Sequence, residues 1–174
     1  FNAAKEVFKT SLRNLKSFIG KSKDEAQQLL STSFLRASVL KRLKHASFVE
    51  TNFIIRKKYR AGITEHKDTH STTLEFYNNL KDSDYVVCVR GAGNFSVRFY
   101  ESLAMGRIPV FINTDCALPF ENEIDWKKQV VWVEFKDRHQ VAQKVKEFHE
   151  ALSKNDFIVN PIFFLSSPKA PCIQ

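Results

Sequence analysis

Three short apolar runs in the second half of the chain most restrict the folds that it can adopt. Residues 85–89 read YVVCV, residues 108–112 read IPVFI and residues 130–135 read VVWVEF. The runs do not alternate between apolar and polar side chains, as a strand with one solvent-exposed face would. They predict parallel strands that are covered on both faces of a sheet.

The segments around these runs follow a helical spacing of apolar residues or are rich in β-branched and aromatic residues. Strands that alternate with helices indicate βαβ units. The sequence therefore predicts an α/β fold, with a Rossmann-like parallel sheet flanked by helices. Further strands are expected at 17–20 and 47–55, and helices at 3–15, 31–45, 72–83, from Val97, and at 138–155.

Length and composition favour one folded domain. The chain has 174 residues, of which 43% are hydrophobic, so it can bury a core. We expect a single Rossmann-like domain over residues 1–174, with a proline-containing tail at 160–174.

No apolar run approaches the roughly 18 residues of a spanning helix, so no transmembrane segment is expected. The three cysteines form no CxxC pair, which fits neither a disulfide scaffold nor a zinc site.

Positive charge is concentrated in the first third of the chain. Residues 1–60 hold 14 Lys and Arg against 4 Asp and Glu, whereas the whole chain has a net charge of +8. A solvated helical face explains most such patterns. The alternative is a non-catalytic, basic nucleic-acid-binding or interaction domain, but neither RNA-binding aromatic motifs nor zinc-finger spacing accompany the charge. Nucleic acid is therefore the less favoured partner.

The loop RGAGNFS, residues 90–96, directly follows the predicted strand YVVCV. Ligands of open parallel sheets collect at the carboxyl ends of the strands. Gly91 and Gly93 are expected to adopt positive φ and let a ligand approach the main chain. Asn94 or Ser96 is expected to cap the helix that follows, whose first N–H groups form an anion site.

Arg98 lies in the first turn of that predicted helix, where a cation opposes the helix dipole by about 0.3–1 kcal/mol. Two interactions could offset this cost. One is an i,i+3 ion pair with Glu101. The other is a bound diphosphate held by Arg90 and Arg98, with Glu101 accepting hydrogen bonds from ribose hydroxyls. The spacing alone does not separate the two.

Metal-binding patterns are weak. Asp82-Ser-Asp84 spells a DxD motif but is expected to form a turn or a helix cap. His66 and His70 lie in a polar connection, and no third ligand is evident. We therefore expect no metal site.

The region from residue 84 to residue 134 closely resembles the C-terminal region of exostosin-like glycosyltransferases, especially their compact bacterial members. Three features occur together and in order: the R-x-x-E helix, the G-x-I-P-V strand and the segment LPFENEIDW at 118–126. Upstream segments resemble the family more loosely.

The resemblance implies an inverting GT-B glycosyltransferase, whose C-terminal half binds a nucleotide-sugar donor without a metal and transfers the sugar to a glycan acceptor. By position, the donor loop would comprise Arg90, Gly91, Gly93, Asn94 and Ser96. Arg98 would contact phosphate, Glu101 would contact ribose, and Asn113 to Asp115 would line the sugar side. UDP-sugars are expected to rank first among donors, and no catalytic residue is assigned.

A GT-B enzyme also needs an N-terminal half that carries the acceptor site, and residues 1–15 are too few to form it. The chain is thus expected to be a donor-binding half and an incomplete enzyme by itself. Asn94-Phe-Ser is a glycosylation sequon inside the proposed loop. Because a glycan there would block the donor, we expect a cytoplasmic setting, at most peripheral to a membrane.

Overall fold

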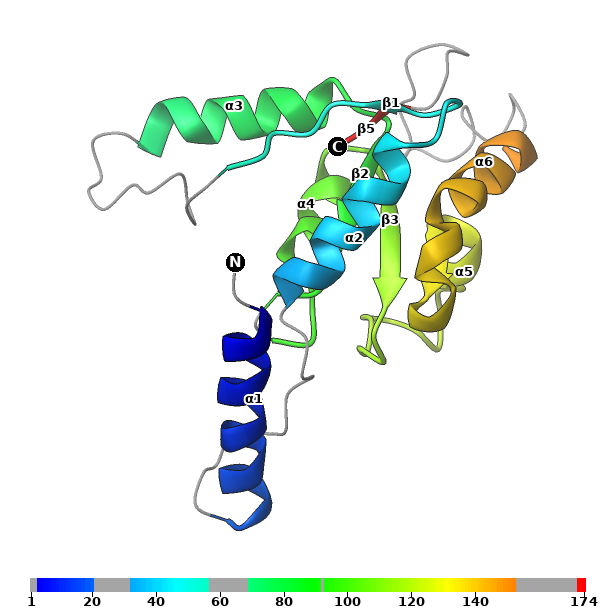
Figure 1. The fold of residues 1–174 in the computed structure, drawn as a ribbon. Coiled ribbons are helices and arrows are strands. Elements are labelled where there is room, and N and C mark those ends of the chain that lie inside the picture. The colour runs from blue at the N-terminus through cyan, green and yellow to red at the C-terminus, as the bar shows by residue number, and fades with distance from the viewer. Residues whose placement is uncertain (1–2, 21–31, 57–68, 92, 153–171) are drawn as a thin grey trace. The chain divides into compact units, whose positions relative to one another are not determined.

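The computed structural model describes residues 3–20, 32–56, 69–91, 93–152 and 172–174. The chain, whose ribbon is shown in Figure 1, divides into two units, Phe1–Ser38 and Val39–Gln174. That residues 1–174 form one domain stays a prediction. Among the helices of the described ranges, none is long and apolar enough to cross a membrane.

The first unit contains helix α1, Ala3–Phe18, and the start of helix α2, Thr32–Lys44. Both helices were expected, but the strand predicted at residues 17–20 is wrong. The Ile19 amide still donates to the Leu15 carbonyl at 3.1 Å, and Gly20, with φ 69°, follows the helix. The apolar residues of this segment continue the helical spacing set by Leu12 and Leu15, which explains why the helix extends to Phe18.

The second unit is built on a sheet of five parallel strands in the order β1-β5-β2-β3-β4, which confirms the predicted α/β fold. The strands are β1 Glu50–Thr51, β2 Tyr85–Cys88, β3 Ile108–Asn113, β4 Val131–Glu134 and β5 Cys172–Ile173. The strand expected at 47–55 is reduced to two residues. Strand β5 was not predicted; it comes from the expected tail, whose residues 160–171 lie outside the described residues.

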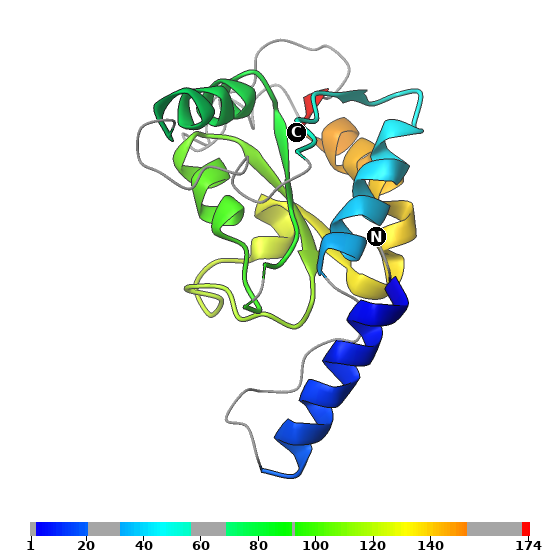
Figure 2. The same cartoon turned by 60° about the vertical axis from the view of Figure 1, so that its left-hand side comes forward.

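Besides the end of α2, the α-helices of this unit are α3 Thr69–Lys81, α4 Val97–Ala104, α5 Trp126–Gln129 and α6 Val141–Ala151. Helices α4 and α6 lie on opposite sides of the sheet (Figure 2). The late helix was predicted to begin at residue 138, but a 3-10 helix, η3 Phe135–Gln140, precedes α6. Helix α4 is followed by Gly106, whose φ of 64° is typical of a residue that ends a helix.

Successive side chains of β2 point to opposite faces of the sheet, and both faces are buried. Val86 and Cys88 belong to a cluster on the α4 side. On the other side, the Tyr85 hydroxyl lies 2.8 Å from Nδ1 of His149 on α6. His149 is half-buried. Burial raises the pKa of Tyr85 above its usual value, and Asp84 adds to the effect.

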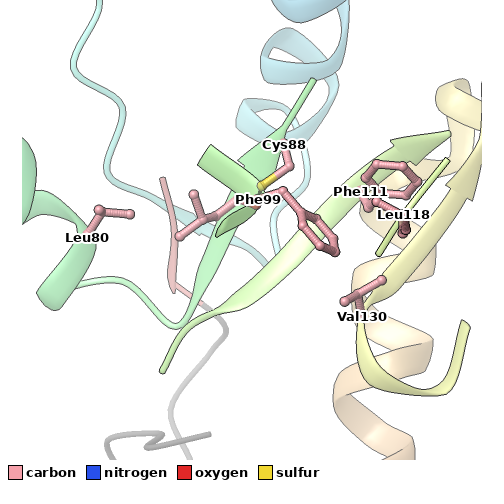
Figure 3. Close-up of a cluster of buried hydrophobic side chains, with 7 residues drawn as sticks. Leu80, Cys88, Phe99, Phe111, Leu118 and Val130 are labelled. Carbon is pink, nitrogen blue, oxygen red and sulfur yellow. Dashed lines mark hydrogen bonds between the residues drawn. The ribbon is translucent and has the colours of Figure 1, made fainter. Parts of the chain in front are cut away.

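Phe99 of α4 is the centre of the cluster between this helix and the sheet (Figure 3). Its ring centroid lies 5.4 Å from that of Phe111 on β3 and 5.2 Å from that of Trp126, both in edge-to-face geometry. The Trp126 indole N–H donates to the Pro119 carbonyl at 2.8 Å. Trp126 thus anchors the loop after β3, whereas Phe120 of the same loop is 66% exposed.

Candidate functional site

Strands β2, β3 and β4 run parallel, so their carboxyl ends meet at one edge of the sheet. Asn113 at the end of β3 is directly beside Glu134 at the end of β4. The described residues of the next loop, 89–91 and 93–96, leave the end of β2 at the same edge. We define the residues of this loop, Asn113 to Asp115 and Glu134 as the carboxyl-edge site.

The glycines of the loop do not have the predicted backbone conformation. Gly91 and Gly93 are both exposed, and neither has a positive φ. The loop instead closes on itself, because the Gly91 amide donates to the Phe95 carbonyl at 2.9 Å. A Cβ atom at Gly93 would lie 3.0 Å from Cε1 of the Phe95 ring. A larger residue at position 93 would therefore require the Phe95 ring, which is 51% exposed, to move aside.

Helix α4 begins where it was expected, but neither candidate side chain caps it. Ser96 occupies the N-cap position, is 7% exposed and makes no side-chain capping bond. Asn94 turns away from the helix: its Nδ2 donates to the Asp115 carbonyl at 3.0 Å, and its Oδ1 accepts from the Thr114 hydroxyl at 2.9 Å. A helix start without a side-chain cap leaves its first N–H groups to water or a ligand.

Arg98 and Glu101 are both half-buried on α4, yet they form no ion pair with each other in the described part of the chain. The Arg98 guanidinium carbon lies 5.5 Å from the ring centroid of Phe76 on α3. Burial lowers the pKa of Arg98; Arg56 acts in the same direction, and the nearby Cys88 and Glu101 act against it. Arg56 itself is paired with Glu75.

Arg90 is half-buried at the start of the loop, and its Nε atom is buried without a hydrogen-bond partner among the described residues. The charge of Arg90 affects the pKa of the nearby Cys116 thiol. Burial raises the pKa of Cys116, and Arg90 acts in the opposite direction. Arg90 thus places a cation at the carboxyl-edge site.

Glu134 was not among the residues predicted from the sequence, although it is a central member of the site. Its Oε1 accepts a hydrogen bond from the Trp132 indole N–H at 2.7 Å, and its Oε2 accepts one from Asn113 Nδ2 at 2.8 Å. These two donors, the Trp132 indole first, lower the pKa of Glu134. The signal in the sequence was a carboxylate at the end of one strand beside an asparagine at the end of the next.

The side chain of Asn113 stabilises the main chain of the loop after β3. Asn113 Oδ1 accepts from the Asp115 amide at 3.0 Å, which forms an Asx turn. Asp115 has φ 59°, a left-handed conformation that aspartate adopts more readily than most residues. The turn therefore fixes the position of the Asp115 carbonyl, which is the group that Asn94 contacts.

Three of the predicted site residues, Asn94, Asn113 and Asp115, are thus connected by hydrogen bonds. Arg98 and Glu101 are not: no hydrogen bond or ion pair between described residues joins them to this group. Arg98 lies toward Phe76 of α3 instead.

Metal ligands are not grouped in the described residues, where no three His, Cys, Asp or Glu side chains could hold an ion together. Asp82 and Asp84 lie between α3 and β2, in the expected turn. His66 and the side chain of His70 lie outside the described residues.

Comparison with known proteins gives a consistent result. The Exostosin GT47 domain family matches residues 7–148. Exostosin-1 of Drosophila melanogaster is 37% identical over 67 residues, 38% of this chain and 9% of that protein. A probable glucuronosyltransferase 47 A of Physcomitrium patens is 33% identical over 101 residues, 56% of this chain and 21% of that protein.

The probable beta-1,4-xylosyltransferase IRX10L of Arabidopsis thaliana is 35% identical over 68 residues, 39% of this chain and 16% of that protein. The chain therefore aligns with less than a quarter of the length of each of these relatives. No solved structure shows a significant match.

Proposed function

The chain belongs to the exostosin GT47 family, and on that premise we propose that it supplies the nucleotide-sugar-binding site of a glycosyltransferase. In the proposed reaction, the sugar passes from a nucleoside diphosphate to a hydroxyl of a glycan acceptor. The names of two relatives, a probable glucuronosyltransferase and a probable xylosyltransferase, support sugar transfer. The acceptor side would belong to an N-terminal GT-B half, and no residue of this chain is assigned as the catalytic base.

The observation that carries the proposal is that Arg98 is half-buried and forms no ion pair with Glu101 among the described residues. A guanidinium stays charged in proteins, so the half-buried Arg98, which also experiences the positive charge of Arg56, needs compensating negative charge. The Phe76 ring provides a weak cation–π contact, and Glu101 does not form the ion pair that spacing allowed. A diphosphate would add negative charge to that of the nearby Glu101, with Arg98 and Arg90 as its ligands.

The remaining roles follow from position. Glu101 lies one helical turn after Arg98, where its carboxylate would accept from ribose hydroxyls. Asn94, Asn113 and Asp115 would line the sugar side of the site, beside the main chain of Gly91, Gly93 and the uncapped start of α4 at Ser96. We expect a UDP-sugar as donor, with the two arginines rather than a metal ion neutralising its phosphates.

The alternative of a basic nucleic-acid-binding module has no comparable support. Arg56, one of the basic residues of the first third, is used internally in its pair with Glu75. Neither the family match nor the named relatives point to nucleic acid.

A cytoplasmic setting also remains our proposal. The Asn94 side chain carries hydrogen bonds to both Thr114 and Asp115. A glycan on its nitrogen would disrupt this arrangement and cover the loop. Expression through a secretory pathway followed by mass spectrometry of the Asn94 peptide would test this, and a glycosylated chain that still binds UDP would contradict it.

The proposed donor site is tested by calorimetric titration of UDP and a UDP-sugar into the wild type and Arg98→Ala. Losing a charge-assisted bond of about 1.5–3 kcal/mol should weaken binding about ten- to hundred-fold. Arg107→Ala is the matched control, because it removes the same charge just before β3, at the amino ends of the strands and away from the proposed donor site. Absence of UDP binding by the wild type, or equal losses in both variants, would overturn the proposal.

A further inference from the structure

The carboxyl-edge site contains a continuous chain of side-chain hydrogen bonds that crosses three strand ends. It begins at Trp132 and Glu134 on β4 and passes to Asn113 at the end of β3. From Asn113 it reaches the Asp115 amide, and the Asp115 carbonyl then accepts from Asn94 in the loop after β2. The donor–acceptor distances along it lie between 2.7 and 3.0 Å.

Glu134 sets which atom of Asn113 donates in this series of hydrogen bonds and which atom accepts. An ionised carboxylate only accepts hydrogen bonds, so the amide nitrogen of Asn113 must face it. The Asn113 oxygen is then the atom left to accept from the Asp115 amide. This bond closes the Asx turn in which Asp115 adopts its left-handed conformation. Glu134 thereby determines which way the Asp115 carbonyl is presented to Asn94.

We propose that Glu134 is a positioning residue of the donor site, which acts through the Asn113 carboxamide to hold the loops after β2 and β3 in their ligand-binding arrangement. The inference rests on the proposed function, because it assigns Glu134 a part in donor binding. Glu134 is not placed in contact with the donor. Its effect is carried by two side chains, Asn113 and Asn94, that the donor site requires in fixed orientations.

The chemistry of the chain allows an exchange experiment with Glu134→Gln, Asn113→Asp and the double variant that combines them. In Glu134→Gln, the single amide oxygen can accept from either Asn113 Nδ2 or the Trp132 indole. The amide nitrogen then faces the other donor, which has lost its acceptor. In Asn113→Asp, two carboxylates face each other.

The double variant restores the pattern of donors and acceptors with the two groups exchanged. The amide nitrogen introduced on β4 donates to the carboxylate introduced on β3, and that carboxylate still accepts from the Asp115 amide. The oxygen of the introduced amide still accepts from the Trp132 indole. The double variant also has the charge of the wild type.

UDP is titrated calorimetrically into all of these variants, and thermal unfolding is recorded for each. We expect each single variant to bind UDP about ten-fold more weakly, and the double variant to return to within about three-fold of the wild type. Glu147→Gln is the matched control. Glu147 on α6 likewise accepts from two side chains, Gln143 and Lys144, each at 3.2 Å, but lies outside the carboxyl-edge site.

A role limited to folding would change the unfolding temperature and leave UDP affinity unaltered well below it. Unchanged affinity in Glu134→Gln, or a double variant no better than the single ones, would overturn the positioning role. If a single variant does not fold, the double variant decides: near-wild-type affinity supports the role, and a ten-fold loss refutes it. A wild type that binds UDP in an Arg98-dependent manner, with Glu134→Gln unaffected, refutes this inference alone. A wild type that does not bind UDP refutes the donor site as well.

Discussion

Asn94 spans the gap between two loops of the carboxyl edge, donating from its side-chain nitrogen to the Asp115 carbonyl 3.0 Å away. Its oxygen accepts from the hydroxyl of Thr114, a residue only 5% exposed. One exposed side chain therefore satisfies polar groups of the neighbouring loop and joins the region after β2 to the region after β3. This link makes the two loops a single structural unit.

Asn94→Ala should lower the free energy of unfolding by about 1–2 kcal/mol, since two hydrogen bonds are lost and the buried Thr114 hydroxyl loses its acceptor. Thr114→Val removes only one of these bonds and keeps the shape of the side chain, so it should cost less. Urea denaturation of both variants and the wild type measures the difference. An Asn94→Ala variant as stable as the wild type would show that the link contributes nothing to stability.

Glu101→Gln should weaken UDP binding more than it weakens binding of the 2′,3′-dideoxy analogue. Only intact ribose hydroxyls can donate to the carboxylate, and replacing a charged acceptor by a neutral one should cost about 1 kcal/mol, or roughly five-fold in affinity. Paired titrations with the two nucleotides measure the ratio. Equal losses for both nucleotides would show that Glu101 does not bind the ribose hydroxyls.

Glu134 should make stability depend on pH in a defined direction. Because its pKa is lowered in the folded chain, by Trp132 and Asn113 first and by Lys127 and Lys136 less strongly, its contribution is present above the unfolded pKa of about 4.3. It is lost as the pH falls below that value through the folded pKa. The stability difference between the wild type and Glu134→Gln should thus be constant from about pH 5 to 7 and shrink toward pH 3.5. Urea midpoints across this range measure it, and a gap that widens on acidification would contradict the assignment.

The central strands could be predicted because burial on both faces leaves a continuous apolar run in the sequence. Strand β2 is buried at each of its positions, which is why YVVCV shows no alternation. Strand β4 is at the edge of the sheet, and its residues alternate between buried and half-buried, yet the large apolar Trp132 conceals this alternation in the sequence. The strand was therefore found, but the half-buried position of Glu134 was not.

Short elements carry too few residues for a periodic signal. Strands β1 and β5 each have two residues, and their place in the sheet is decided by pairing with distant neighbours rather than by local sequence. The error at residues 17–20 has another cause: a short apolar run at a helix end has the composition of a strand. Only its spacing from Leu12 and Leu15 indicates a helix.

For the site, the sequence predicted where the loops would meet but not how their side chains would interact. Asn94 was expected to cap α4 and instead contacts Asp115. That choice depends on the separation of two loops in space, which spacing along the chain does not contain. The roles of Arg90, Arg98 and Glu101 in donor binding stay predictions.

The position of β5 has a consequence for the order in which the fold can assemble. Cys172 pairs with Glu50, and Ile173 lies between Thr51 and Tyr85, so this strand separates β1 from β2. The pairing of β1 with β5 joins residues about 120 positions apart, a contact with a high loop-closure entropy. Strands β2, β3 and β4 can pair through short crossovers without it. The edge strand β1 can join the sheet only after β5 has docked on β2, which places the carboxyl-edge site in the part of the sheet that can form early and β1 in the part that forms late.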